Sequence, residues 1–142
     1  MNAETLLASK SPEIITTGPH VPLIEAALTL ARRRIGALPV VDDCGEVVGL
    51  LTERDIVYRY AERGPQALQG DVASVMSRLI AVCGPRDMVS EIARRMTERQ
   101  MRHMLIMEDG RMLGIVSIGD VVNSRVQAAE RESQELKAYI AS

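Results

Sequence analysis

The chain contains one short motif twice: a glycine, two apolar residues, a threonine or serine, and an aspartate three positions after it. The two copies are Gly49-Leu50-Leu51-Thr52-Glu53-Arg54-Asp55 and Gly114-Ile115-Val116-Ser117-Ile118-Gly119-Asp120. If a strand ends at Thr52 or Ser117 and a helix follows, the hydroxyl caps a helix N-terminus, whose unpaired N–H groups and positive dipole favour a phosphate. The carboxylate of Asp55 or Asp120 then lies in the first helical turn, where it can accept hydrogen bonds from a diol such as ribose.

The same spacing also suits helix capping alone. A Ser or Thr followed three residues later by an acidic side chain is a variant of the capping box, which stabilises a helix without any ligand. A single occurrence would favour this interpretation. Two occurrences in equivalent places of a repeated chain favour a pair of binding sites.

The surrounding sequence is itself repeated. A shift of 65 positions aligns Ser9 to Tyr60 with the later part of the chain without a gap, and it brings Gly45 onto Gly110. A fixed repeat indicates one structural unit built twice. A unit of about 50 residues buries little apolar surface alone, so we expect the two copies to pack sheet against sheet.

Each copy predicts the order β-α-β-β-α. Short apolar runs at residues 13–16 and 78–82 are predicted strands, and each is followed by a helix. Two further strands, joined by an acidic turn with glycine, precede the last helix. These strands are predicted at residues 38–41 and 47–51 in the first copy and at 104–107 and 112–116 in the second.

Apolar residues at helical spacing define the predicted buried face of the first helix in each copy. In the first copy they are Ile24, Ala27, Leu28 and Ala31, and at the matching positions of the second they are Val89, Ile92, Ala93 and Met96.

Taken in order, these motifs resemble a tandem pair of CBS domains, named after cystathionine β-synthase, also called a Bateman module. The resemblance rests on residues 35–42, Gly45 and residues 49–55 in the first copy, and on residues 101–106, Gly110 and residues 114–120 in the second. It covers roughly residues 5–128. It implies an α/β (α+β) fold of two pseudo-symmetric repeats with two clefts, which take AMP, ADP, ATP, NAD(H) or S-adenosylmethionine in many members.

The resemblance also implies roles for individual residues. Thr52, Asp55, Ser117 and Asp120 would hold phosphate and ribose, while Arg102 and His103 resemble an Arg-His pair that meets phosphates. Backbone at Gly36, Ala37, Pro39, His103 and Met104 would line the adenine pocket, and Thr16 and Thr17 would face a cleft.

The two predicted clefts differ in composition. The gap-free alignment replaces Thr17 by Val82 and Pro39 by Met104, and it sets Gly36-Ala37 against Met101-Arg102. Arg54, a candidate phosphate partner, becomes Gly119, which opens space beside the helix start. We therefore expect unequal ligand affinities.

The repeats set the expected domain boundaries. Residues 1–62 form the first repeat with its lead-in, 63–76 a linker and lead-in helix, 77–128 the second repeat, and 129–142 a helical tail. Apolar residues recur along this tail, which either packs on a partner subunit or extends into solvent.

Composition argues against several other functions. A net charge of −2, without Phe or Trp, disfavours nucleic-acid binding, and the two cysteines and two histidines form no metal-ligand motif. The N-terminus lacks a signal-peptide pattern and no apolar run is long enough for a bilayer, so a cytoplasmic location without membrane contact is expected.

The preferred hypothesis is a stand-alone, homodimeric sensor of adenine nucleotides that regulates another protein, requires no cofactor and is not an enzyme. Two other classes stay open: a dimerisation or protein-interaction module with vestigial clefts, and a small nucleotide hydrolase, for which the sequence offers no identifiable base or metal cage.

Overall fold

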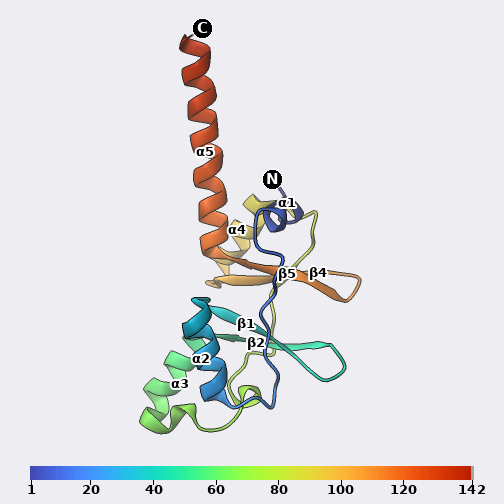
Figure 1. The fold of residues 1–142 in the computed structure, drawn as a ribbon, viewed down its shortest axis with the longest axis vertical. Helices are drawn as coiled ribbons and strands as arrows, with labels where there is room; N and C mark the ends of the chain where they lie inside the picture. The colour runs from blue at the N-terminus through green and yellow to red at the C-terminus, as the bar shows by residue number, and fades with distance from the viewer. Residues whose placement is uncertain (142) are drawn as a thin grey trace. The chain divides into compact units, whose positions relative to one another are not determined.

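Short strands and helices alternate through residues 1–141, which the computed structural model describes (Figure 1). Strands β1 and β2 form one antiparallel sheet, and β3, β4 and β5 form a second, mixed sheet. The elements are α1 (Ala3–Ala8), α2 (Leu23–Arg33), β1 (Ala37–Val41), β2 (Val47–Thr52), α3 (Glu53–Arg63), the 3-10 helices η1 (Gly64–Leu68) and η2 (Val72–Ser74), β3 (Val82–Cys83), α4 (Val89–Glu98), β4 (His103–Glu108), β5 (Arg111–Ser117) and α5 (Ile118–Ala141).

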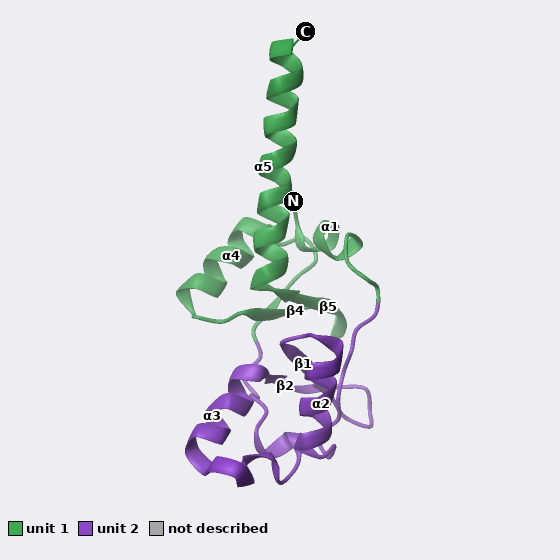
Figure 2. Ribbon diagram, turned by 60° about the vertical axis from the view of Figure 1, so that its left-hand side comes forward, with its two compact units in different colours: residues 1–12, 81–142 green, residues 13–80 purple. Residues whose placement is uncertain are grey.

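Two compact units divide the chain, and they do not follow its linear order (Figure 2). Unit 2 is Glu13–Ile80, and unit 1 joins residues 1–12 to the chain from Ala81 onward. The segment that precedes each repeat therefore packs on the other repeat: α1 lies in unit 1, and η1 and η2 lie in unit 2.

In each unit, a glycine in the second strand of the hairpin leaves room for the segment that precedes the other repeat, which we call the lead-in segment. A Cβ atom on Gly114 would lie 2.5 Å from Leu7 Cδ2, and one on Gly49 would lie 2.5 Å from Met76 Sδ and 3.0 Å from the Ser77 carbonyl oxygen. A strand glycine often marks such a close approach. The glycine of each Gly-x-x-Thr/Ser motif thus has a packing role.

Helix α2 buries a different face from the one predicted. Leu23, Ala26 and Leu30 lie in the core of unit 2, whereas Ile24 and Leu28 are 47% and 43% exposed. The helix carries apolar residues on both faces, so periodicity alone could not select the buried one. In α4 the prediction is confirmed, because Val89, Ile92 and Met96 are buried in the core of unit 1.

The first predicted strand of the first repeat is absent. Residues 13–16 form no strand, and only Thr17 makes a single parallel bridge, to Val40. In unit 1 the Leu105 amide donates to the Ala81 carbonyl beside the short parallel strand β3. The residue that corresponds to Leu105 in the first repeat is Pro39, which has no N–H to donate, so this ladder cannot extend.

The structure also corrects the gap-free alignment. The Glu53 amide donates to the Gly36 carbonyl, and the Ile118 amide donates to the Arg102 carbonyl. The two donors are 65 positions apart, but the two acceptors are 66 apart. The additional residue of the first copy lies in its hairpin loop, since Val41 pairs with Val47 whereas Met107 pairs with Met112.

This shift changes the expected equivalences before the hairpin. Ala37 corresponds to His103, because these residues pair with Thr52 and Ser117. By the same register Gly36 corresponds to Arg102, Pro39 to Leu105, and Thr17 to Cys83. The predicted pairs Pro39 with Met104 and Thr17 with Val82 are wrong.

Candidate functional site

Strand β2 ends and helix α3 begins at Thr52, as predicted. Its Oγ1 accepts a hydrogen bond from the Asp55 amide at 3.2 Å, and Asp55 Oδ2 accepts one from the Thr52 amide at 2.9 Å. Ala37 lies opposite Thr52 in the ladder, and the Gly36 carbonyl takes the Glu53 amide. Four of the predicted site residues therefore meet at this strand–helix junction of unit 2.

Unit 1 contains the same junction between β5 and α5. Ser117 Oγ accepts from the Asp120 amide at 3.1 Å, and Asp120 Oδ2 accepts from the Ser117 amide at 2.8 Å. His103 lies opposite Ser117, and the Arg102 carbonyl takes the Ile118 amide. A Cβ on Gly119 would lie in van der Waals contact with Ser117 Oγ, at 3.5 Å, so the glycine keeps a side chain away from the capping hydroxyl.

Both junctions form reciprocal capping bonds. Each hydroxyl and one oxygen of each carboxylate satisfy backbone amides that the helix itself leaves without partners. The structural role considered from the sequence is therefore real at both sites. Capping also fixes the Asp55 and Asp120 carboxylates in the first turns of α3 and α5. In each carboxylate Oδ2 accepts the capping bond, and Oδ1 lies outside it.

Lys10 is a residue of the unit 1 junction that the sequence analysis missed. Its Nζ lies 2.6 Å from Asp120 Oδ2 and donates to the Ile115 carbonyl at 2.8 Å. The Lys10 and Asp120 side chains are only 30% and 24% exposed. No local pattern could reveal this contact, because the two residues are 110 positions apart and the lead-in segment packs on the later repeat.

Lys10 changes the electrostatics of Asp120. Partial burial alone would raise the pKa of this carboxyl group, but the Lys10 ammonium and the hydrogen bonds from Ser117 outweigh that effect and hold the pKa below its ordinary value of 3.8. Asp120 is therefore an anion at neutral pH, with a cation directly beside it.

Unit 2 satisfies the equivalent strand carbonyl in another way. The Leu50 carbonyl, which corresponds to that of Ile115, accepts from the Ser77 backbone amide at 2.9 Å. A neutral amide thus stands where unit 1 has a lysine. The first turn of α3 also carries Glu53 and Arg54, whose charges offset each other, where α5 has Ile118 and Gly119. The unit 1 junction is therefore the more electropositive of the two.

The other predicted site residues lie apart from the capping bonds. Thr16 is exposed and Thr17 bridges Val40, while Arg54 is exposed in the first turn of α3. Pro39 is buried in β1, and the Met104 side chain is fully buried in the unit 1 core. Contact between Met104 and a ligand would therefore involve its main chain.

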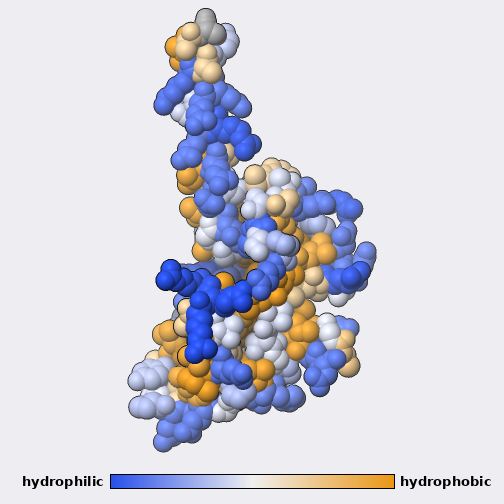
Figure 3. All heavy atoms as spheres, in the orientation of Figure 1, coloured by the Kyte–Doolittle hydropathy of each residue, from blue (hydrophilic) through white to orange (hydrophobic). Residues whose placement is uncertain are grey.

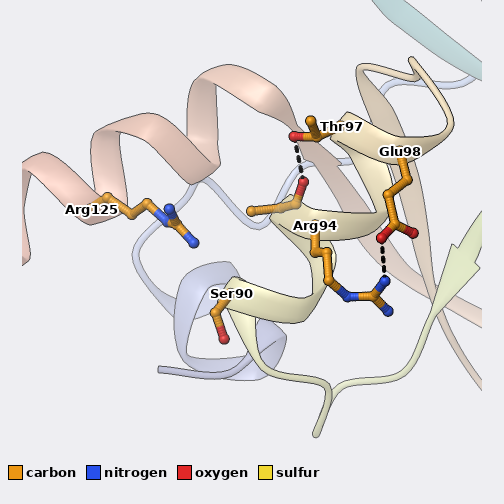
Figure 4. A pocket seen from close by; sticks show the side chains of 6 residues that line it. Ser90, Arg94, Thr97, Glu98 and Arg125 are labelled. Carbon is orange, nitrogen blue, oxygen red and sulfur yellow. Dashed lines mark hydrogen bonds and ion pairs between the residues drawn. The ribbon is translucent and has the colours of Figure 1, made fainter.

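A shallow pocket of about 260 Å³ lies between α4 and α5 in unit 1 and contains none of the predicted residues (Figure 4). Arg94 at its edge is held by Glu98 and by Glu91, and Arg125 approaches from α5. Ligand pockets usually enclose roughly 300–1,000 Å³, so this open groove is a poor candidate for the main site. It is lined by Ser90, Ala93, Arg94, Thr97, Glu98 and Arg125.

The remaining reactive side chains form no second centre in residues 1–141. Within that range no three His, Cys, Asp or Glu residues are grouped to hold a metal ion. Cys44 is exposed and Cys83 is buried; burial, with a smaller contribution from Asp87, raises the pKa of the Cys83 thiol to about 11. None of the described helices is long and apolar enough to span a membrane.

Comparisons with known proteins agree with this architecture. The CBS domain family model matches residues 8–62 and 72–126. The mitochondrial CBS domain-containing protein CBSX3 of Arabidopsis thaliana is 34% identical over 122 residues, which are 82% of this chain and 58% of the relative. The chain thus spans little more than half of that relative's length.

Solved structures confirm the predicted CBS-pair fold. The crystal structure of the CBS-domain containing protein ATU1752 from Agrobacterium tumefaciens is 39% identical, has a TM-score of 0.84, and matches 87% of this chain and 92% of its own. The CBS domain pair of protein MJ0100, solved with 5-methylthioadenosine and S-adenosyl-L-methionine, is 24% identical, has a TM-score of 0.77, and matches 92% of this chain and 98% of its own.

Proposed function

The chain belongs to the CBS-domain family, and from this premise we propose that it is a regulatory module that binds an adenine nucleotide, AMP, ADP, ATP or NAD(H), at its strand–helix junctions. The single observation that carries the proposal is the junction built twice, with a capping hydroxyl at a helix N-terminus and a carboxylate fixed in the first turn. A helix N-terminus favours phosphate, and a carboxylate oxygen outside the capping bond can accept from ribose. The adenosine ligands of MJ0100 support the same ligand class.

We propose that the phosphate-bearing ligand prefers the unit 1 junction. Lys10 lies beside Asp120, Arg102 precedes β4, and Gly119 keeps a side chain away from the capping hydroxyl. The unit 2 junction instead has the Ser77 backbone amide where unit 1 has Lys10, and the charges of Glu53 and Arg54 at the start of α3 offset each other. Lys10 also occupies Oδ2 of Asp120, so a ribose hydroxyl that donates to this carboxylate must bind beside the Lys10 ammonium group.

The test is a thermal-shift screen of nucleotide-stripped protein with AMP, ADP, ATP, NAD, NADH and S-adenosylmethionine. A ligand at 100 times its Kd adds roughly 2.7 kcal/mol to the free energy of unfolding. The variants Asp120→Asn and Asp55→Asn are matched, because an asparagine oxygen can still accept the capping bond. We expect the shift to fall strongly in Asp120→Asn and little in Asp55→Asn.

Several results would count against these proposals. If none of the six compounds shifts the melting temperature, nucleotide sensing is excluded. If both variants shift as much as wild type, the carboxylates have no role in binding, and if both lose the shift equally, the preference for unit 1 is wrong. Circular dichroism of each variant shows whether the fold is intact, so a lost shift is not mistaken for unfolding. Turnover of ATP or NAD would contradict the proposal that the chain binds without catalysis.

The wider biological role belongs to the same proposal. We propose a cytoplasmic homodimer that signals nucleotide levels to a regulated protein, with no nucleic-acid or membrane partner. For such signalling the protein must have two conformations, and the nucleotide must bind one of them more tightly than the other, because only this difference in affinity shifts their populations.

A second function, a protein-interaction module with vestigial sites, is favoured by one observation. The capping bonds and Lys10 already satisfy much of the polar chemistry at Ser117 and Asp120 without a ligand. This alternative expects no ligand-dependent stabilisation and a partner protein that binds equally well with and without nucleotide.

A further inference from the structure

Helix α5 continues far beyond the part of unit 1 on which it packs (Figure 1). Val121 is 2% exposed, but almost every later position is exposed, including Leu136 at 57% and Ile140 at 82%. Most helical stability in proteins comes from packing of an apolar face rather than from intrinsic propensity. Large apolar side chains left in solvent along a helix are typical of an interaction surface.

Exposed apolar residues of α5 fall on heptad positions. Counting from Val122, these positions alternate between spacings of four and three residues and lie along one stripe; apolar residues fill five of the six positions, and Ser133 fills the remaining one. Figure 3 shows hydrophobic spheres at intervals along one side of this helix, between hydrophilic ones. We call this stripe the α5 seam: Val122, Val126, Ala129, Ser133, Leu136 and Ile140.

The α5 seam is separate from the face of α5 that packs on unit 1. At about 100° per residue, the stripe lies roughly a quarter turn from the buried Val121. Val121 is buried in the core of unit 1 and the Ser124 hydroxyl contacts Met1, so the packed face is made by residues outside the stripe. The seam is therefore available for its whole length.

Charges beside the seam fit a second copy of the same helix in parallel orientation. With Val126 and Ser133 at heptad position a, Arg125 and Glu132 take position g, and Glu130 and Lys137 take position e. In a parallel pair each g residue meets the e residue five positions later on the partner helix. Arg125 then faces Glu130 of the second copy, and Glu132 faces Lys137 of the second copy.

The antiparallel arrangement is less favourable. If two α5 helices crossed in opposite directions about Arg131, each Glu132 would face Glu132 of the second copy, and each Glu130 would face Glu130. Like charges at these flanking positions destabilise a pair.

We propose that α5 pairs with α5 of a second copy as a parallel, in-register coiled coil along the α5 seam. The pairing uses surfaces away from both strand–helix junctions and needs no nucleotide, so it goes beyond the proposed sensing function. Ala129 and Ser133 are small residues in the middle of the seam, and they limit its stability.

The test measures the mass of the ligand-free full chain by analytical ultracentrifugation over a range of concentrations. Wild type is expected at twice the 15.6 kDa chain mass, and Leu136→Glu, which puts a charge in the seam, is expected to be monomeric. Ala138→Glu makes the same kind of change on the far side of α5 and is expected to stay dimeric.

Charge exchange tests the orientation. Glu132→Lys and Lys137→Glu should each weaken the dimer by placing like charges at g and e, and the double variant should restore it. A monomeric wild type, or a dimer equally stable in Leu136→Glu and Ala138→Glu, would overturn the pairing; failure of the double variant to recover would overturn the parallel register. These outcomes are independent of the nucleotide screen.

Discussion

Lys10 illustrates what a single side chain contributes at the residue scale. Removing it as Lys10→Met deletes the bonds to Asp120 and to the Ile115 carbonyl, which are only partly screened by solvent. We expect the free energy of unfolding in urea to fall by about 1–2 kcal/mol. Arg78→Met removes a charge from an exposed position and should change it little; equal effects of the two substitutions would contradict the role of Lys10.

The same ion pair predicts a dependence on pH. The pKa of Asp120 is lower in the folded protein than its ordinary value of 3.8, so the unfolded chain takes up the proton first. The stabilisation is therefore complete above that value and is lost as the pH falls through the lower, folded pKa. Urea unfolding between pH 6 and 3 should show a steeper loss for wild type than for Lys10→Met, and parallel curves would rule out this linkage.

Close glycine contacts give a further prediction for single residues. In Gly114→Ala the new Cβ meets the end of the flexible Leu7 side chain, whereas in Gly49→Ala it meets both Met76 and the Ser77 backbone carbonyl. Backbone cannot move aside as easily as a side-chain end, so Gly49→Ala should cost about 2–3 kcal/mol and Gly114→Ala about 1 kcal/mol. Chemical denaturation of the two variants checks the order, and the reverse order would contradict these contacts.

At the scale of elements, Pro39 limits the sheet of unit 2. Pro39→Val supplies an N–H where Leu105 has one in unit 1, and the Ile15 carbonyl is the corresponding acceptor. We expect the new amide at position 39 to be protected from hydrogen exchange, as measured by NMR, to a degree comparable with Leu105. Exchange as fast as in an exposed loop would show that something other than the missing donor prevents this strand.

Sequence reasoning succeeded for elements with a local cause. The capping residues Thr52 and Ser117 mark both helix starts, and the glycine turn at Gly110 has the positive φ that a hairpin needs. Sequence reasoning gave the wrong result where the sequence allows two alternatives. Helix α2 has apolar residues on both faces, so the buried face could not be chosen from periodicity. The extra residue in the first hairpin loop could not be detected either, because the apolar pattern of the flanking strands fits an alignment with or without a gap.

At the scale of the whole molecule, each lead-in segment packs on the repeat that does not follow it in the sequence: residues 1–12 pack on unit 1, and the segment before the second repeat packs on unit 2. The Met1 carbonyl accepts from the Val89 amide, and the Ala3 amide donates to the Asp87 carbonyl, so the N-terminal segment is tied to unit 1. Neither contact has a sequence signal, because the partners lie more than 80 residues apart. The site at Asp120 was therefore predicted without its lysine.

Deleting residues 1–12 should consequently weaken the repeat that is distant in sequence. We expect hydrogen-exchange mass spectrometry to show lost protection in α4 and β5, with α2, β1 and β2 much less affected, because α1 and Lys10 contact unit 1. Loss confined to residues 13–62 would contradict this arrangement.

The division of the chain into units has a mechanical consequence. Both α1 and α5 belong to unit 1, so unit 2 is an insertion that the chain enters between residues 12 and 13 and leaves between residues 80 and 81. Unit 2 is part of the covalent chain between α1 and α5, but the non-covalent contacts of the N-terminal segment with the rest of unit 1 bypass it. A load applied to α1 and α5 is therefore carried first by these contacts within unit 1. Stretching the molecule from these helices should open the Lys10–Asp120 junction before it disturbs the Thr52–Asp55 junction.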